Sequence, residues 1–127
     1  MTTTSLELAK ELSEVCKENG IKLPVGQFSY FKWNYPTQED PKIIEMLPSS
    51  KDSSPNWLFL APAYTLDELL EWLFAKTNYI SIKSDISPKK GWTAWCEVKG
   101  WMVYQEDLNP ANAACKLLIW LIKEVLL

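Results

Sequence analysis

The sequence predicts an α+β protein in which helices pack on an antiparallel sheet of about three to five strands. Three observations predict this class: segments with the apolar spacing of helices, segments with the alternation of half-buried strands, and a Lys99-Gly100 turn that joins two of those strands. The expected order is α-β-β-α-β-β-β-α. Because 127 residues fall in the size range of one domain, we expect a single domain over 1–127.

The first helix is expected over residues 5–19. Thr4 and Glu7 stand at the spacing of a capping box, in which a hydroxyl and a carboxylate satisfy free N–H groups at the helix start. Gly20 is a natural C-terminal stop. The apolar positions that share one face of this helix are Leu8, Leu12 and Val15.

The next segment combines strands with a long loop. Residues 27–34 are rich in aromatic residues and alternate enough for a strand, and 57–60 form a short apolar strand or extended entry segment. Between them, residues 35–56 predict a loop with one short helical turn near Ile43–Leu47. Loops of this length are uncommon in small domains and tend to be mobile or functional.

The middle of the chain predicts a second helix and a further strand. Thr65 and Glu68 form a second capping box, and apolar residues at helical spacing continue to about Lys76. Residues 79–87 then alternate as a half-buried strand. Its apolar side carries Ile80, Ile82 and Ile86, and its other side carries Tyr79, Ser81, Lys83 and Asp85.

Residues 91–98 and 101–106 predict a hairpin closed by the Lys99-Gly100 turn. A two-residue turn fixes the register, so Trp95 is expected opposite Tyr104. The side expected in the core carries Ala94, Cys96, Val98, Trp101 and Val103. The opposite side carries Thr93, Trp95, Glu97, Met102 and Tyr104.

The last helix is predicted from an Asn109 N-cap and Pro110 at the first helical position. Residues 111–127 continue it without a helix breaker. Because 117–122 are apolar on nearly every side, we expect this helix to be covered on more than one side. Its polar stripe contains Lys116 and Lys123, with Trp120 between them.

The charged residues exclude several kinds of site. All 13 basic residues are Lys, the chain contains neither Arg nor His, and its net charge is −3. Without Arg there is no guanidinium for bidentate binding of phosphate or guanine, so sequence-specific nucleic-acid binding is not expected. Without His there is no Ser-His-Asp or Cys-His catalytic arrangement and no imidazole metal ligand. We therefore expect no enzyme activity, no metal and no cofactor.

The cysteines and the apolar runs indicate the compartment. Cys16, Cys96 and Cys115 are widely spaced and odd in number, without a CxxC pair, so we expect free, buried thiols and a cytosolic setting. The amino terminus lacks the basic start and apolar run of a signal peptide. The longest apolar run, residues 117–122, is far shorter than the ~20 residues that span a bilayer. The expectation is a cytoplasmic protein without a membrane segment.

The aromatic side of the hairpin is the leading candidate site. Trp95, Met102 and Tyr104, with Tyr79 alongside, are of types enriched at protein interfaces. Alternatively, the first helix or the 35–56 loop covers them as a second core layer. Trp120 is likewise either packed under the first helix or exposed at a contact with a partner or a second copy.

A small-ligand site is the second candidate. Lys89 and Lys90 could contact phosphate, while Trp92 and Trp95 could stack on a base, completed at a subunit boundary. No glycine-rich phosphate loop supports this reading. Among the acids, Glu97 and Glu106 flank the aromatic side and are the ones that could line a cleft.

Two helical segments carry a family resemblance: Tyr64–Leu73 (YTLDELLEWL) and Asn109–Glu124 (NPANAACKLLIWLIKE). Both resemble small phage and prophage proteins in which a TLDELLEWL-like helix precedes a β-meander and an NPADALAKLLIWLIE-like helix ends the chain. The arrangement is also similar to the phage ABA-sandwich proteins. The match covers about a third of the chain. It involves helix-packing motifs, so it implies an origin in a phage but no site residues.

These observations lead to two functional hypotheses. The first is a non-enzymatic phage-type accessory protein of the host cytoplasm that acts by protein–protein interaction, with inhibition of a host factor as one form of that action. Its partner would be a host protein or, in self-association, a second copy in a homodimer. The alternative is a small-ligand or nucleotide-sequestering protein.

Overall fold

The computed structural model describes residues 3–33, 42–44, 57–77, 79–84 and 91–125. It confirms the α+β class and the antiparallel pairing of all strands described. The elements along the chain are α1 (Leu6–Glu18), β1 (Ser29–Trp33), β2 (Lys42–Ile44), β3 (Trp57–Pro62), α2 (Leu66–Lys76), β4 (Ile80–Ser84), β5 (Trp92–Val98), β6 (Trp101–Asp107) and α3 (Pro110–Val125).

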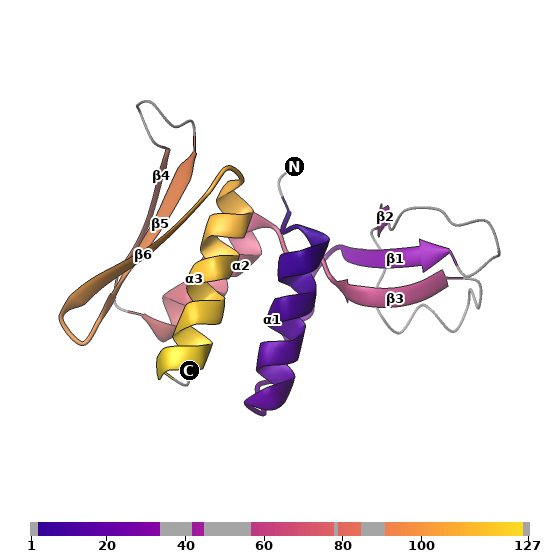
Figure 1. The fold of residues 1–127 in the computed structure, drawn as a ribbon, viewed down its shortest axis with the longest axis horizontal. Coiled ribbons are helices and arrows are strands. Elements are labelled where there is room, and N and C mark those ends of the chain that lie inside the picture. Colours follow the sequence, from indigo (N-terminus) through magenta and orange to yellow (C-terminus); the bar gives the residue numbers. More distant parts are fainter. Residues whose placement is uncertain (1–2, 34–41, 45–56, 78, 85–90, 126–127) are drawn as a thin grey trace.

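The strands form two separate sheets, with the orders β2-β1-β3 and β4-β5-β6. Figure 1 shows the helices between them, with α3 beside the β4-β5-β6 sheet and α1 beside the β1-β3 pair. We expected one sheet from the sequence, because alternation along a strand identifies a buried side but not the element that covers it. A further difference is β2, since Lys42–Ile44 form a strand where the sequence predicted the start of a helical turn. The rest of that predicted turn lies outside the described residues.

The start of α1 differs from the predicted capping box. Ser5, not Thr4, is the N-cap, and its hydroxyl accepts a hydrogen bond from the Leu8 N–H at 3.4 Å. Thr4 instead continues an extended segment, in which its N–H donates to the Tyr64 carbonyl at 3.0 Å. The helix stops just before Gly20, as predicted, with Asn19 as its C-cap. Gly20 has a positive φ of 67°, a conformation that favours glycine.

Two other local predictions are confirmed. The capping box at α2 forms in full, because Thr65 Oγ1 accepts from the Glu68 N–H and the Glu68 carboxylate accepts from the Thr65 N–H. The turn between β5 and β6 has positive φ at both Lys99 and Gly100, 50° and 83°. That combination is the type I′ hairpin turn, so Trp95 pairs with Tyr104 as predicted.

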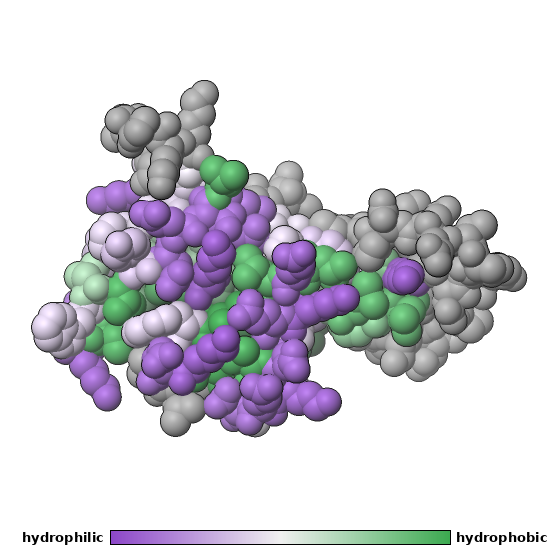
Figure 2. Space-filling view, viewed as in Figure 1, coloured by the Kyte–Doolittle hydropathy of each residue, from purple (hydrophilic) through white to green (hydrophobic). Residues whose placement is uncertain are grey.

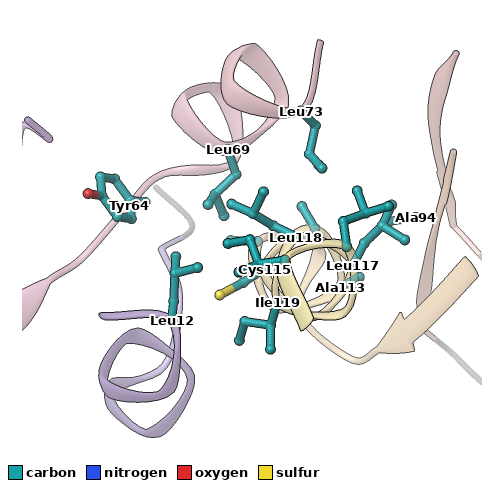
Figure 3. Packing of buried hydrophobic residues seen from close by; sticks show 14 of the residues in the cluster. Leu12, Tyr64, Leu69, Leu73, Ala94, Ala113, Cys115, Leu117, Leu118 and Ile119 are labelled. Atoms are coloured by element: carbon teal, nitrogen blue, oxygen red, sulfur yellow. The ribbon is translucent and has the colours of Figure 1, made fainter. Parts of the chain in front are cut away.

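The main core is built around α3, which is buried on several sides at once. Figure 3 shows Leu117 beside Ala94 of β5, Leu118 beside Leu69 of α2, and Cys115 on the side of Leu12. The α3 side chains that are buried are Ala111, Ala113, Ala114, Cys115, Leu117, Leu118, Ile119, Leu121 and Ile122. The prediction that this helix is covered on more than one side is confirmed.

A smaller cluster joins α1 to the β2-β1-β3 sheet. It contains Ala9 of α1, Tyr30 of β1 and Ala61 of β3. The Tyr30 hydroxyl donates to the Thr4 carbonyl, so the buried phenol is paired. Phe31 and Phe59, which are register partners, meet edge to face with ring centroids 5.7 Å apart. The second sheet is therefore fixed to the helices through α1.

We predict that Leu118→Ala lowers the free energy of unfolding by about 2–5 kcal/mol, the usual cost of truncating a fully buried leucine. Leu118 has no exposed surface, and its truncation leaves a cavity between α3 and α2. Urea denaturation measures the effect, with exposed Lys123→Ala on the same helix as the control. Equal midpoints for both variants would contradict the role of α3 as the core helix.

The buried thiols predict a loss of stability in alkali. Cys16, Cys96 and Cys115 are free and buried. Burial raises the pKa of Cys16 and Cys96 to about 11 and that of Cys115 to about 12, from an ordinary 9.0. Above about pH 9 the unfolded chain loses thiol protons that the native protein retains, so stability is complete below that pH and falls as pH rises toward 11–12.

Urea midpoints measured along a pH series test this expectation. Cys96→Ala should make the alkaline decline shallower, because one of the raised thiol pKa values is removed. A decline that is equally steep in Cys96→Ala and in the wild-type chain would contradict it.

Candidate functional site

The outer face of the β4-β5-β6 sheet brings together four of the five predicted interface residues. Ser81, Trp95 and Tyr104 form one cross-strand row. In the next row, Glu97 lies opposite Met102, and the Glu97 N–H donates to the Tyr79 carbonyl at 3.2 Å. We call the set Tyr79, Trp95, Met102 and Tyr104 the aromatic face.

The side chains of the aromatic face are accessible. Tyr79 is 46% exposed, Met102 50% and Tyr104 52%, and Trp95 is half-buried. The Trp95 and Tyr104 rings lie against each other with centroids 4.8 Å apart. Such a contact holds both rings in place without removing them from solvent.

The alternative that α1 covers these residues is wrong. α1 packs against α3 and β3, and Figure 1 shows α3 between α1 and the β4-β5-β6 sheet. The helices therefore occupy the inner face of the sheet. Figure 2 shows hydrophilic side chains spread over the helices, with residues of intermediate hydropathy at the sheet end of the molecule. The 35–56 loop, the other proposed cover, lies mostly outside the described residues.

Two tryptophans of the hairpin, Trp101 and Trp92, do not belong to the aromatic face. Trp101 was expected in the core but is 77% exposed, because it follows the turn at the hairpin tip, beyond the helices (Figure 1). Trp92 is half-buried and packs against the main core from the inner face. Trp92 and Trp95 therefore project from opposite faces of β5, which separates the two rings of the proposed ligand site. Lys89 and Lys90 lie outside the described residues.

Trp120 lies in a different place from the aromatic face. It is half-buried on α3 and lines a hollow of about 210 Å³, which we call the flank groove. The residues that line the flank groove are Glu11, Gln105, Lys116, Ile119, Trp120 and Lys123. Sequence reasoning could not assemble this set, because its members come from α1, β6 and α3 and share no motif.

The charges of the flank groove are paired within the chain. Lys116 Nζ lies 2.8 Å from Asp107 Oδ2, and Lys123 Nζ lies 3.3 Å from Glu11 Oε1. Burial acts to raise the pKa of Asp107, but hydrogen bonds from Lys116 and from the Asn109 N–H hold it below its ordinary value. The groove thus presents neutralised charge pairs around an indole ring.

A second hollow, of about 390 Å³, lies beside α2. Tyr64 and Trp72 meet edge to face in its wall, with centroids 6.0 Å apart. Two of its three polar side chains, Glu68 and Tyr64, serve the local structure, and the third is Glu71. Glu68 accepts hydrogen bonds from the Thr65 and Gln27 N–H groups, and the Tyr64 hydroxyl donates to the Pro24 carbonyl. Two of the three polar side chains in this wall are therefore already engaged within the chain.

Among the described residues, no group of His, Cys, Asp and Glu side chains could hold a metal ion. Within the same ranges, no helix has the length and apolar character needed to cross a membrane.

Comparison of the sequence with protein-family models and with curated proteins, and of the fold with solved structures, finds no match.

We predict that Trp95→Ala combined with Tyr104→Ala leaves the melting temperature close to that of the wild-type chain. Both rings retain contact with water, and the residues beneath them on the inner face are not touched. Differential scanning calorimetry measures the effect, with Leu73→Ala, a fully buried change, as the destabilised reference. A loss of stability as large as that of Leu73→Ala would show that the aromatic face is a core layer.

Proposed function

We propose that this chain is a non-enzymatic interaction protein that docks on a partner protein through the aromatic face. The observation that carries the proposal is the stacked and accessible Trp95–Tyr104 pair, with Met102 and Tyr79 in the adjacent row. Aromatic residues and methionine are enriched at interfaces, and a cluster of exposed apolar groups is typical of a surface that another molecule covers.

The polar groups of this face suggest the chemistry of the partner. Glu97 is exposed between Tyr79 and Met102, and no cation among the described residues pairs with it. Lys83 and Glu106 lie at the other end of the face. A fitting partner is a protein with an apolar patch and a Lys or Arg placed to reach Glu97. The resemblance to phage proteins supports a host protein in this role, whose activity the docking would inhibit.

The alternative function, sequestration of a small ligand or nucleotide, has less support. The site proposed for it relied on Trp92 and Trp95 acting together, and these side chains leave β5 on opposite faces. Neither of the two hollows lined by described residues includes a residue of the aromatic face, whereas small-ligand sites are concave.

Affinity capture with matched variants tests the proposed function. The tagged wild-type chain and Phe74→Ala, which removes an exposed ring from α2, should retain the same protein from a lysate of the native host. Trp95→Ala should lose that protein, and Glu97→Lys should bind it more than tenfold more weakly in titrations with the purified partner, a difference of about 1.4 kcal/mol or more. Equal binding by the wild-type chain and Trp95→Ala would overturn the proposal.

A further inference from the structure

The outer edge of β6 has backbone groups that no described strand uses. β6 is the last strand of its sheet and hydrogen-bonds to β5 alone among the described strands. Val98 and Trp101 flank the two-residue turn and form a hydrogen-bonded pair. From there, pairs with and without backbone hydrogen bonds alternate along the two strands. Met102, Tyr104 and Glu106 belong to pairs without them, so their N–H and C=O groups point away from β5. Lys116 Nζ donates to the Glu106 carbonyl at 3.1 Å from outside the sheet, in agreement with this alternation.

The first half of this edge lacks the devices that usually protect a free strand. Edge strands are commonly blunted by lysine, proline, a bulge or short length. The opposite edge strand, β4, contains Lys83, and in the other sheet β3 ends at Pro62 and β2 is three residues long. β6 has seven residues in continuous register, with neither Lys nor Pro among them. It is the edge of the described sheets best suited to accept another strand.

We infer that β6 pairs antiparallel with β6 of a second copy of this chain, so that two three-stranded sheets join into one. A twofold axis beside Val103 puts Met102 of each copy opposite Tyr104 of the other, and each of these pairs exchanges both backbone hydrogen bonds. On the inner face, Val103 meets Val103 of the second copy and Trp101 meets Gln105. The 77% exposed Trp101 side chain then gains a covering strand.

Charge favours a second copy in this register. The acidic end of β6, Glu106 and Asp107, falls opposite the turn residues Gly100 and Lys99 of the second copy, so the acids of the two copies do not face each other. Lys116 already holds the Glu106 carbonyl and the Asp107 carboxylate, so the strand pairing covers residues 101–105. The twofold axis is normal to the sheet, which brings both flank grooves to the same side of the dimer. The Lys116–Asp107 and Lys123–Glu11 pairs have already neutralised their charges.

This pairing uses the edge of β6 and leaves the outer face open, so it goes beyond the proposed function. In the dimer, the two aromatic faces become parts of one continuous sheet surface. A partner that binds the aromatic face would then meet two copies of it side by side.

Disulfide trapping tests the register. Val103 lies on the twofold axis in a pair without hydrogen bonds, where Cα atoms stand about 4.5 Å apart and a disulfide fits. Under mild oxidation, Val103→Cys should give a covalent dimer on a non-reducing gel, whereas Gln105→Cys, on the same face of the same strand, should stay largely monomeric. The wild-type chain controls for its three buried thiols. Cross-linking of Gln105→Cys as efficient as that of Val103→Cys would overturn the proposed pairing.

Sedimentation equilibrium tests the dimer itself. The wild-type chain should show twice the mass of one chain, and Met102→Pro should shift to the monomer mass because it removes an outward N–H and places a proline ring on the edge. Ser84→Pro makes the matched change on the opposite edge strand β4 and should remain dimeric. Circular dichroism checks that both variants are folded. Tyr104→Lys, which places a charged side chain on the edge strand without a proline, should also shift the chain to the monomer mass.

A monomeric wild-type chain at every concentration, or dimerisation that survives both Met102→Pro and Tyr104→Lys, would overturn the inference. The proposed function fails separately. Trp95 lies on β5, away from the edge, so Trp95→Ala should abolish capture of the partner and keep the dimer.

Discussion

The burial of α3 is the constraint on which the rest of the structure depends. Nine of the α3 side chains are buried, and they point in several directions around the helix axis. No single surface can cover such a helix, so β5 and β6, α2 and α1 each cover one part of it. The helices cover the inner face of the β4-β5-β6 sheet in this way, whereas Met102 and Tyr104 on its outer face stay about half exposed.

A polar network fixes where α3 begins. Asn109 Oδ1 accepts from the Ala111 N–H at 2.8 Å, and Asn112 Oδ1 accepts from the Ser5 N–H at 2.7 Å, so the starts of α3 and α1 are tied together. Asp107 ties the end of β6 to the start of α3, because its carboxylate accepts from the Asn109 N–H and pairs with Lys116. Because these partners are partly buried, each bond also avoids the cost of an unpaired polar group.

The two surfaces that we propose for binding, the aromatic face and the β6 edge, present different chemical groups. The aromatic face offers side chains, held by the Trp95–Tyr104 contact and directed outward by strand alternation. The β6 edge offers backbone groups at Met102 and Tyr104, which another strand can pair with regardless of its side chains. The same two residues contribute to both surfaces, so dimerisation would order the side chains that a partner protein meets.

The sequence by itself determined most of the local elements, with the N-cap of α1 and the strand β2 as exceptions. The Thr65–Glu68 box, the Lys99-Gly100 turn and the Asn109-Pro110 start each depend on neighbours in the chain, and all three formed as predicted. The tertiary structure alone decided which faces are covered. Alternation placed Trp101 on the side of Cys96, but the helices do not reach the hairpin tip, so Trp101 is exposed. The flank groove likewise forms where Glu11, Gln105 and Trp120 come together from α1, β6 and α3. The spacing of residues along the sequence does not predict such a contact between three separate elements.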